Sequence, residues 1–250
     1  MKFVYVLTII LCCWTLFSGN SSDSIKYGVP GKQDYVLVRE GYSVGYSNKN
    51  FQPYWASYIL TRDKVLANVC NRADDFRPDP ATYYSATLAD YRGSGYDRGH
   101  IVPAADMHWS TNAMSESFLL TNMSPQTPAF NRGIWKDLES WVRCTASNEV
   151  SIAVVTGPVF YTNTTHKVIG KSHKITVPDG YYKVIYDETE PKKMIGFLLP
   201  NEGSTNSLRS FSCTVDKVEE ITGLDFFNLL DSEIQERLES ESNPNQWENL

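Results

Sequence analysis

The chain carries Tyr96-Asp97-Arg98-Gly99-His100 near its middle, and two further polar stretches follow it. These are Leu120-Thr121-Asn122-Met123-Ser124-Pro125-Gln126 and Asn131-Arg132-Gly133-Ile134-Trp135-Lys136-Asp137-Leu138-Glu139. A phosphodiester hydrolase must deprotonate a water molecule, neutralise the charge that develops at phosphorus and stabilise the departing oxygen. A histidine, a metal ion and an arginine supply these three effects. The three stretches contain a histidine, arginines and hard oxygen donors, which are the groups that this chemistry requires.

His100 is the candidate general base of this chemistry. An imidazole with a pKa near ~6.5 accepts a proton from water at neutral pH, and the motif singles out this residue among the four histidines of the chain. For His108, His166 and His173 we keep the commoner interpretation, a hydrogen-bonded structural residue. Gly99 is expected to let the backbone turn sharply or approach a substrate closely.

Asn131 is the candidate metal ligand. Its amide oxygen is a hard donor of the kind that Mg²⁺ accepts while keeping most of its water ligands, and Mn²⁺ is the alternative ion. Asparagine is also a good helix N-cap, so a second interpretation is that Asn131 caps a helix starting near Gly133. The two roles are compatible, because a cap uses one group of the side chain and the metal needs one oxygen.

Glu139 is the candidate acidic residue of the site. It lies eight residues after Asn131, which is about 12 Å along a helix axis. The two side chains are therefore not expected to share one metal ion directly. Because a helical side chain leans toward the N-terminus of its helix, Glu139 is expected to orient water at the metal. A plain surface glutamate is the alternative.

In their order along the chain, the three stretches resemble those of the DNA/RNA non-specific endonucleases, the ββα-metal nucleases that include endonuclease G and secreted bacterial nucleases. Later stretches extend the resemblance over most of the chain: Val155-Thr156-Gly157-Pro158, Tyr181-Tyr182-Lys183-Val184 and Thr214-Val215-Asp216 to Thr222-Gly223-Leu224. The resemblance implies an α+β fold, in which helices flank a central antiparallel sheet with a ββα-metal active-site motif. It also implies a sugar-non-specific endonuclease that hydrolyses DNA and RNA with little sequence preference and leaves 5′-phosphate ends.

Polar residues around the motif complete the expected site. Arg98 is expected to stabilise the charge at phosphorus or to position the substrate, with a structural salt bridge as the alternative. The resemblance implies a second substrate-binding arginine upstream of the motif, and both Arg72 and Arg77 are candidates. Asp97 is expected to hold the loop, and Asn122 to bind the backbone of the site, which leaves the sequon of Asn122 without a glycan.

Residue patterns outside the motif predict a frame dominated by strands. Runs rich in Val, Ile, Tyr and Phe predict strands over residues 35–44, 54–61, 150–160, 181–186 and 194–199. Apolar spacing and capping residues predict helices over residues 134–146, 215–221 and 231–238. Segment 71–94 is expected to be a loop, and the polar tail over residues 239–250 is expected to fray. No Pro-rich or Gly/Ser-rich linker interrupts residues 25–240, so we expect one domain over residues 22–250.

The N-terminus predicts export from the cell. After Met1-Lys2, residues 3–17 form an uncharged apolar run that ends in small polar residues, a pattern typical of a signal peptide, here over residues 1–21. The run is shorter than the ~20 residues of a spanning helix, and an uncleaved anchor is the alternative. We therefore expect a secreted glycoprotein, without membrane contact after cleavage, whose exposed sequon is at Asn163.

Composition limits the possible functions. The chain has 29 acidic and 23 basic residues and a net charge of −6, so a site for a polyanion must be local and is expected to use a metal ion. Cys70, Cys144 and Cys213 remain after cleavage, and the sequence does not choose a disulfide pair among them. A homodimer is left open. Two rivals remain: a binding protein of the same fold that holds nucleic acid or another polyanion without cleaving it, and an adhesion or carbohydrate-binding module.

Overall fold

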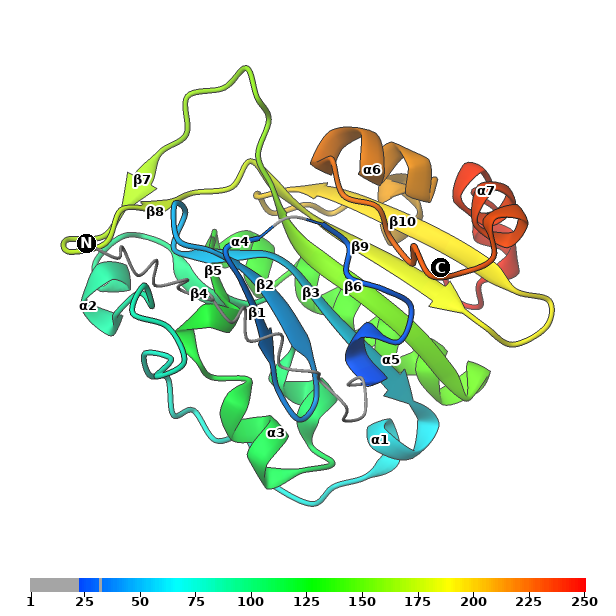
Figure 1. The fold of residues 1–250 in the computed structure, drawn as a ribbon, viewed down its shortest axis with the longest axis horizontal. Helices are drawn as coiled ribbons and strands as arrows, with labels where there is room; N and C mark the ends of the chain where they lie inside the picture. Colours follow the sequence, from blue (N-terminus) through cyan, green and yellow to red (C-terminus); the bar gives the residue numbers. More distant parts are fainter. Residues whose placement is uncertain (1–22, 32) are drawn as a thin grey trace, which may run out of the picture.

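The computed structural model describes residues 23–31 and 33–250, and the expected signal peptide over residues 1–21 lies outside them. A seven-stranded antiparallel sheet forms the centre of the fold, with the strands in the order β1-β2-β3-β6-β9-β10-β11 (Figure 1). The strands are β1 (Tyr35–Val38), β2 (Ser43–Ser47), β3 (Gln52–Thr61), β6 (Ser151–Val159), β9 (Gly180–Asp187), β10 (Lys193–Pro200) and β11 (Ser212–Cys213). The expected α+β fold with a central antiparallel sheet is confirmed.

Helices flank this sheet, and two small sheets lie outside it. The helices are α1 (Arg62–Leu66), α2 (Leu88–Tyr91), α3 (Thr111–Glu116), α4 (Pro128–Asn131), α5 (Ile134–Glu149), α6 (Val215–Thr222) and α7 (Ser232–Ser240). The small sheets pair β4 (Asp97–His100) with β5 (Met123–Gln126), and β7 (Val168–Ile169) with β8 (Ile175–Thr176). Within the described residues, no helix is both long and apolar enough to cross a membrane.

Alternating side chains on the central strands build two cores, one on each face of the sheet. On β9, Tyr181 and Ile185 belong to the core that packs against α5, whereas Tyr182 and Val184 belong to the core beneath α6 and α7. Figure 1 shows α5 on one side of the sheet and α6 with α7 on the other. The strands β3, β6, β9 and β10 contribute to both cores, and the single sheet connects them.

Residues 35–44 form two strands rather than the one expected from the sequence. The chain reverses between β1 and β2, where the Arg39 amide donates a hydrogen bond to the Tyr42 carbonyl at 2.8 Å. Gly41 and its charged neighbours make this turn, and the strand-forming residues on both sides of it masked the signal.

The C-terminal tail is packed, so the expectation that it frays is wrong. Trp247 is only 3% exposed and lies against Trp141, with ring centroids 5.9 Å apart. The Trp141 indole also donates a hydrogen bond to the Glu248 carbonyl at 3.0 Å. One buried tryptophan therefore anchors a segment whose composition is otherwise polar.

The central motif folds as a hairpin followed by a helix. β4 and β5 pair antiparallel over their whole length, and the chain then forms α4 and, after Gly133, the long helix α5. Because side chains two residues apart on a strand share a face, Arg98 and His100 point to the same side of β4. This arrangement brings the hairpin and α5 around one cavity.

Candidate active site

A cavity of about 380 Å³ lies where β4, the first turns of α5 and the segment around Arg72 meet. Its lining consists of Arg72, Phe76, Asp97, Arg98, His100, Pro103, Ala104, Ala105, Asn131, Arg132, Lys136, Glu139 and Arg143. Five of these residues are basic and two are acidic, so the cavity is positively charged although the whole chain has a net charge of −6. A polyanion is therefore attracted to this part of the surface.

His100 is neutral in this cavity. Its ring packs edge to face against Phe76 and Phe118, with ring centroids 5.4 and 4.9 Å apart. The Nε2 atom is buried and has no hydrogen-bond partner among the described residues. Burial, and then the positive charges of Arg72 and Arg98, lower the pKa of the imidazole from 6.5 to about 3. The ring is therefore unprotonated at physiological pH, and Nε2 has a free lone pair.

Aromatic rings hold the two arginines that flank His100. The guanidinium carbon of Arg98 lies 4.3 Å from the ring centroid of Phe76, and that of Arg72 lies 4.8 Å from the centroid of Phe118. No carboxylate in the described part of the chain forms an ion pair with Arg98. The structural salt bridge considered for Arg98 is thus absent among these residues, and its charge is available to a ligand.

Arg77 lies outside the cavity lining. Its Nη1 donates hydrogen bonds to Asp75 Oδ2 at 2.6 Å and to the Ser115 carbonyl at 3.0 Å. These contacts hold the loop against α3. Of the two upstream arginines expected to bind substrate, the structure therefore places only Arg72 at the cavity.

Asp97 fixes the orientation of Asn131. Its carboxylate accepts a hydrogen bond from Asn131 Nδ2 at 2.9 Å and two from Arg132 at 2.9 and 2.8 Å. Burial acts to raise the pKa of Asp97, but the hydrogen bonds from Arg132 and Asn131 outweigh it and lower the pKa. Because an ionised carboxylate only accepts hydrogen bonds, the amide nitrogen of Asn131 must face Asp97. The Oδ1 atom of Asn131 is left as a hard oxygen donor at the cavity.

Asn131 does not cap α5, so that alternative from the sequence is wrong. It is the last residue of α4, and Gly133 is the N-cap of α5. A Cβ atom on Gly133 would lie 2.6 Å from the Ala129 carbonyl oxygen, so glycine permits the tight junction between the two helices. Across this junction, Asn131 and Glu139 line the same cavity.

Glu139 interacts electrostatically with a buried lysine, Lys183. Burial raises the pKa of Glu139, and the charge of Lys183 acts against this shift. Lys183 on β9 is fully buried; its Nζ donates a hydrogen bond to Thr156 Oγ1 at 3.3 Å and lies 4.7 Å from the ring centroid of Trp135. Burial lowers the pKa of Lys183, and Glu139 acts against that shift. The two groups thus stabilise each other's charged forms.

A second charged pair holds the next turn of α5. Arg143 donates a hydrogen bond to Asp106 Oδ1 at 2.9 Å, and the Tyr58 hydroxyl donates one to Asp106 Oδ2 at 2.9 Å. Asp106 is only 1% exposed. Because Tyr58 belongs to β3, these contacts fix the cavity-lining side of α5 relative to the central sheet.

Asn122 and Gly99 support the backbone of the motif. Asn122 is fully buried; its Oδ1 accepts from the Val102 amide at 3.0 Å, and its Nδ2 donates to the Val102 and Ser117 carbonyls at 2.9 Å. This burial leaves no room for a glycan. Gly99 makes no turn, because it lies within β4, where a Cβ atom would lie 2.1 Å from Gln126 Oε1. Glycine at this position makes room for Gln126.

Part of the cavity was not assigned from the sequence. Lys136 and Arg143 were not assigned, although they lie three residues before and four residues after the assigned Glu139 on α5, a spacing that places all three on one helix face. By contrast, Phe76 and Lys183 come from segments far apart along the chain, and no local pattern indicates that they meet the motif.

The remaining histidines form hydrogen bonds outside the cavity, and the cysteines form no disulfide. The hydrogen-bond partners are the Cys70 carbonyl for His108, Asp179 for His166 and Asp90 for His173, at 2.7, 2.8 and 2.8 Å. None of these three histidines lines the cavity. The thiols of Cys70, Cys144 and Cys213 are free, so no disulfide joins them.

Comparison with known proteins identifies the family. The family model of the DNA/RNA non-specific endonucleases matches residues 20–233. Nuclease C1 of Cunninghamella echinulata var. echinulata is 35% identical over 232 residues, covering 86% of this chain and 91% of the relative. Human mitochondrial Endonuclease G is 33% identical over 215 residues, with coverages of 80% and 72%. Mitochondrial Nuclease 1 of Schizosaccharomyces pombe is 33% identical over 233 residues, with coverages of 86% and 72%.

A solved structure agrees with this family in three dimensions. A chain in the crystal structure of the EndoG/EndoGI complex has a TM-score of 0.78 and 31% sequence identity, covering 85% of this chain and 92% of that chain. Members of the family typically depend on a metal ion. The family match contains every residue of the cavity lining. This chain therefore belongs to the DNA/RNA non-specific endonuclease family and is a nuclease.

Proposed function

We propose that this chain is a secreted, Mg²⁺-dependent endonuclease that hydrolyses DNA and RNA with little sequence preference, with His100 as its general base. One observation carries the proposal: a neutral imidazole with an unpartnered nitrogen shares a basic cavity with the amide oxygen of Asn131 and the carboxylate of Glu139. Recognition of bases is not needed, because contacts to the phosphate backbone carry no sequence information.

His100 accepts the proton of a water molecule that attacks phosphorus in line. Arg98 and Arg72 bind the phosphate oxygens and stabilise the charge that develops on them. The bond between phosphorus and the 3′-oxygen breaks, the 3′-oxygen takes a proton from solvent, and a 5′-phosphate end remains. A bound phosphate also offsets the arginine charges that lower the pKa of His100, so the base becomes stronger in the complex.

The oxygen donors of the cavity fit a magnesium ion. Asn131 presents Oδ1, since its nitrogen is bound by Asp97, and Glu139 lines the same cavity. Mg²⁺ keeps most of its water ligands, so one amide oxygen and a carboxylate that orients water suit it. When bound, the ion stabilises the charge on the phosphate and on the departing oxygen. Mn²⁺ prefers the same hard donors and is expected to substitute.

Incubation with supercoiled plasmid and with single-stranded RNA tests this function. We expect cleavage of both substrates with Mg²⁺ and none after EDTA is added. The binding-only rival predicts retarded migration of the plasmid without cleavage in any divalent ion. His100→Ala is the matched control, because it is expected to retain binding and to lose cleavage.

We also propose that residues 1–21 are a signal peptide and that residues 22–250 form one domain. The apolar run after Lys2 supports the first proposal, and the single sheet between the two cores supports the second. A mitochondrial transit sequence is rich in arginine, whereas the first arginine here is Arg39. Sequencing of the mature N-terminus is expected to give a start between about residues 19 and 24. A retained Met1 in an intracellular protein would contradict export.

A further inference from the structure

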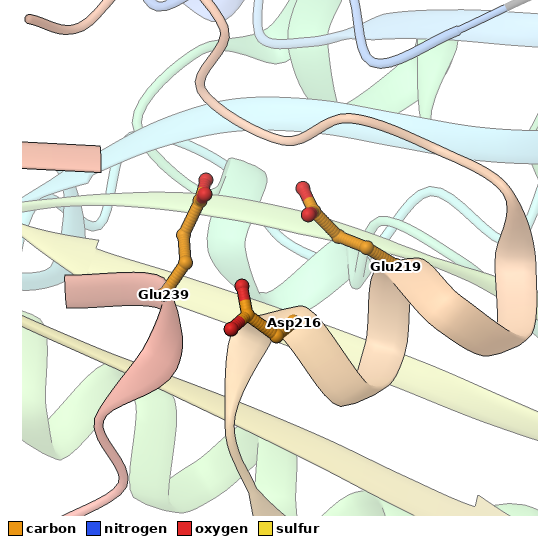
Figure 2. A group of neighbouring side chains, drawn as sticks. All are labelled: Asp216, Glu219 and Glu239. Carbon is orange, nitrogen blue, oxygen red and sulfur yellow. The ribbon is translucent and has the colours of Figure 1, made fainter. Parts of the chain in front are cut away.

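Three carboxylates come together between α6 and α7, on the sheet face away from the cavity. Asp216 and Glu219 belong to α6 and Glu239 to the last turn of α7, and one oxygen of each lies within 4.8 Å of the others. We call them the α6–α7 carboxylates; Figure 2 shows them grouped around one space. No lysine, arginine or histidine of the described chain forms an ion pair with them. Their mutual repulsion is therefore not compensated by a protein cation.

Glu239 distinguishes this group from an ordinary acidic surface. The residue is only 5% exposed, and its Oε1 atom is buried without a hydrogen-bond partner in the described part of the chain. A buried polar atom that lacks a partner is destabilising, so an observation of this kind indicates a missing ligand. Glu219 is held in position, because its Oε1 accepts a hydrogen bond from the Phe226 amide at 2.7 Å. Its second oxygen is left for another partner.

We infer that the α6–α7 carboxylates form a structural site for a divalent cation, and that Ca²⁺ fits the site best. Calcium binds oxygen at about 2.3–2.6 Å, so two ligands of one ion lie up to about 5 Å apart. Oxygens within 4.8 Å of one another satisfy this limit. Magnesium binds at about 2.0–2.1 Å in a rigid octahedron, so it would require every pair of oxygens to lie within about 4.2 Å, whereas calcium accepts the whole range up to 4.8 Å.

The cation joins the two C-terminal helices. α6 buries Val215 and Val218, and α7 buries Leu238, in the core on this face of the sheet. An ion shared by both helices therefore stabilises their packing and gives the orphaned oxygen of Glu239 a partner. With three protein carboxylates, the expected dissociation constant is about 10⁻⁴–10⁻³ M. The site shares no residue with the catalytic cavity.

Thermal unfolding of the full chain, with Ca²⁺ as the added ion, tests the site. The parent protein is Asn131→Ala, which removes the proposed metal ligand of the cavity. At about 10 mM Ca²⁺ and a dissociation constant of about 1 mM, we expect the melting temperature to rise by about 3–6 °C. Glu239→Gln is expected to lose most of this rise. Glu236→Gln, which changes an exposed carboxylate on the same helix, is expected to keep it.

A second variant guards against effects on folding. Asp216→Asn changes the exposed member of the group, so it is expected to melt like the parent without calcium and to lose most of the calcium-dependent rise. Absence of a rise in the parent, or a full rise in both Glu239→Gln and Asp216→Asn, overturns the inference. The Glu239 carboxyl would then be protonated instead, because burial and the charge of Glu219 raise its pKa to about 8.

Discussion

The two faces of the sheet hold charged groups in different ways. Beneath α5, buried charges of opposite sign compensate each other, as in the pair of Arg143 and Asp106. Between α6 and α7, the clustered groups are all carboxylates. Buried charge is destabilising unless it is paired, so the ion pairs beneath α5 stabilise that face, whereas the carboxylates between α6 and α7 have no cationic side chain of the described residues beside them. Paired charges therefore hold the residues around the cavity on the α5 face, whereas the α6–α7 face lies away from the cavity and carries unpaired carboxylates.

The largest effect is expected from the base on the α5 face. His100→Ala should lower turnover by ~10²- to 10⁴-fold, since a general base contributes about that factor. His166→Ala is the matched control, because His166 pairs with Asp179 outside the cavity, and its turnover should stay near that of wild type. Plasmid cleavage measures both variants, with circular dichroism to check folding. Wild-type turnover in folded His100→Ala would show that His100 is not the general base.

The next effect concerns the charge that flanks this base. Arg98→Ala should lower the rate by about 10- to 100-fold on every sequence, because it removes a charged contact to phosphate. It should also reduce the slope of log rate against log salt concentration by about one. Arg77→Ala removes the same charge outside the cavity and should change little. The assignment of Arg98 fails if the two variants lose equal activity.

A smaller effect is expected from pH. Burial raises the pKa of Glu139, whereas the pKa of His100 is lowered, so protonation of Glu139 should limit the rate as pH falls. Lys183→Met removes the charge that lowers the pKa of Glu139. The acid limb of the pH profile of kcat/KM should therefore move to higher pH, and kcat/KM at neutral pH should fall by roughly 3- to 10-fold. In Glu139→Gln, kcat/KM should no longer fall as the pH is lowered from about 8 to about 6. An acid limb that stays unchanged in both variants would assign it to another group.

The smallest effect on catalysis is expected on the opposite face. Val218→Ala truncates a fully buried side chain of α6 and should lower the free energy of unfolding by about 1–3 kcal/mol. Turnover per folded molecule should not change, because Val218 belongs to the core on the sheet face away from the cavity. Urea unfolding and plasmid cleavage on the same sample separate the two quantities. A clear loss of turnover in the folded variant would mean that the two faces are coupled.

The elements that the sequence predicted correctly are those with strong local periodicity. The apolar stripe of Ile134, Leu138, Trp141 and Val142 is buried on α5 as expected, because helix spacing alone decides which side faces the core. The turn around Gly41 and the packing of Trp247 were not predicted. Strand-forming residues on both sides masked the turn, whereas the packing of Trp247 depends on the distant Trp141, which composition and spacing do not report.

The same distinction holds within the site. Two short sequence stretches indicated His100 and Asn131, and the structure places both residues at one cavity. The lowered pKa of His100 depends on Arg72 and on burial by Phe76 and Phe118, which only the folded chain brings together. Local sequence therefore predicts which residues meet at the cavity, whereas their protonation is set by tertiary packing.

The most direct test of the central claim is a Mg²⁺ titration of plasmid cleavage by folded His100→Ala and Asn131→Ala. The claim is that one cavity contains a base and a separate metal ligand. We predict that Asn131→Ala weakens metal affinity by about 10- to 100-fold, so raising Mg²⁺ restores part of its rate. No concentration of Mg²⁺ should restore His100→Ala, because the proton acceptor is absent. Equal recovery of both variants, or cleavage by His100→Ala at the wild-type rate, would contradict the claim.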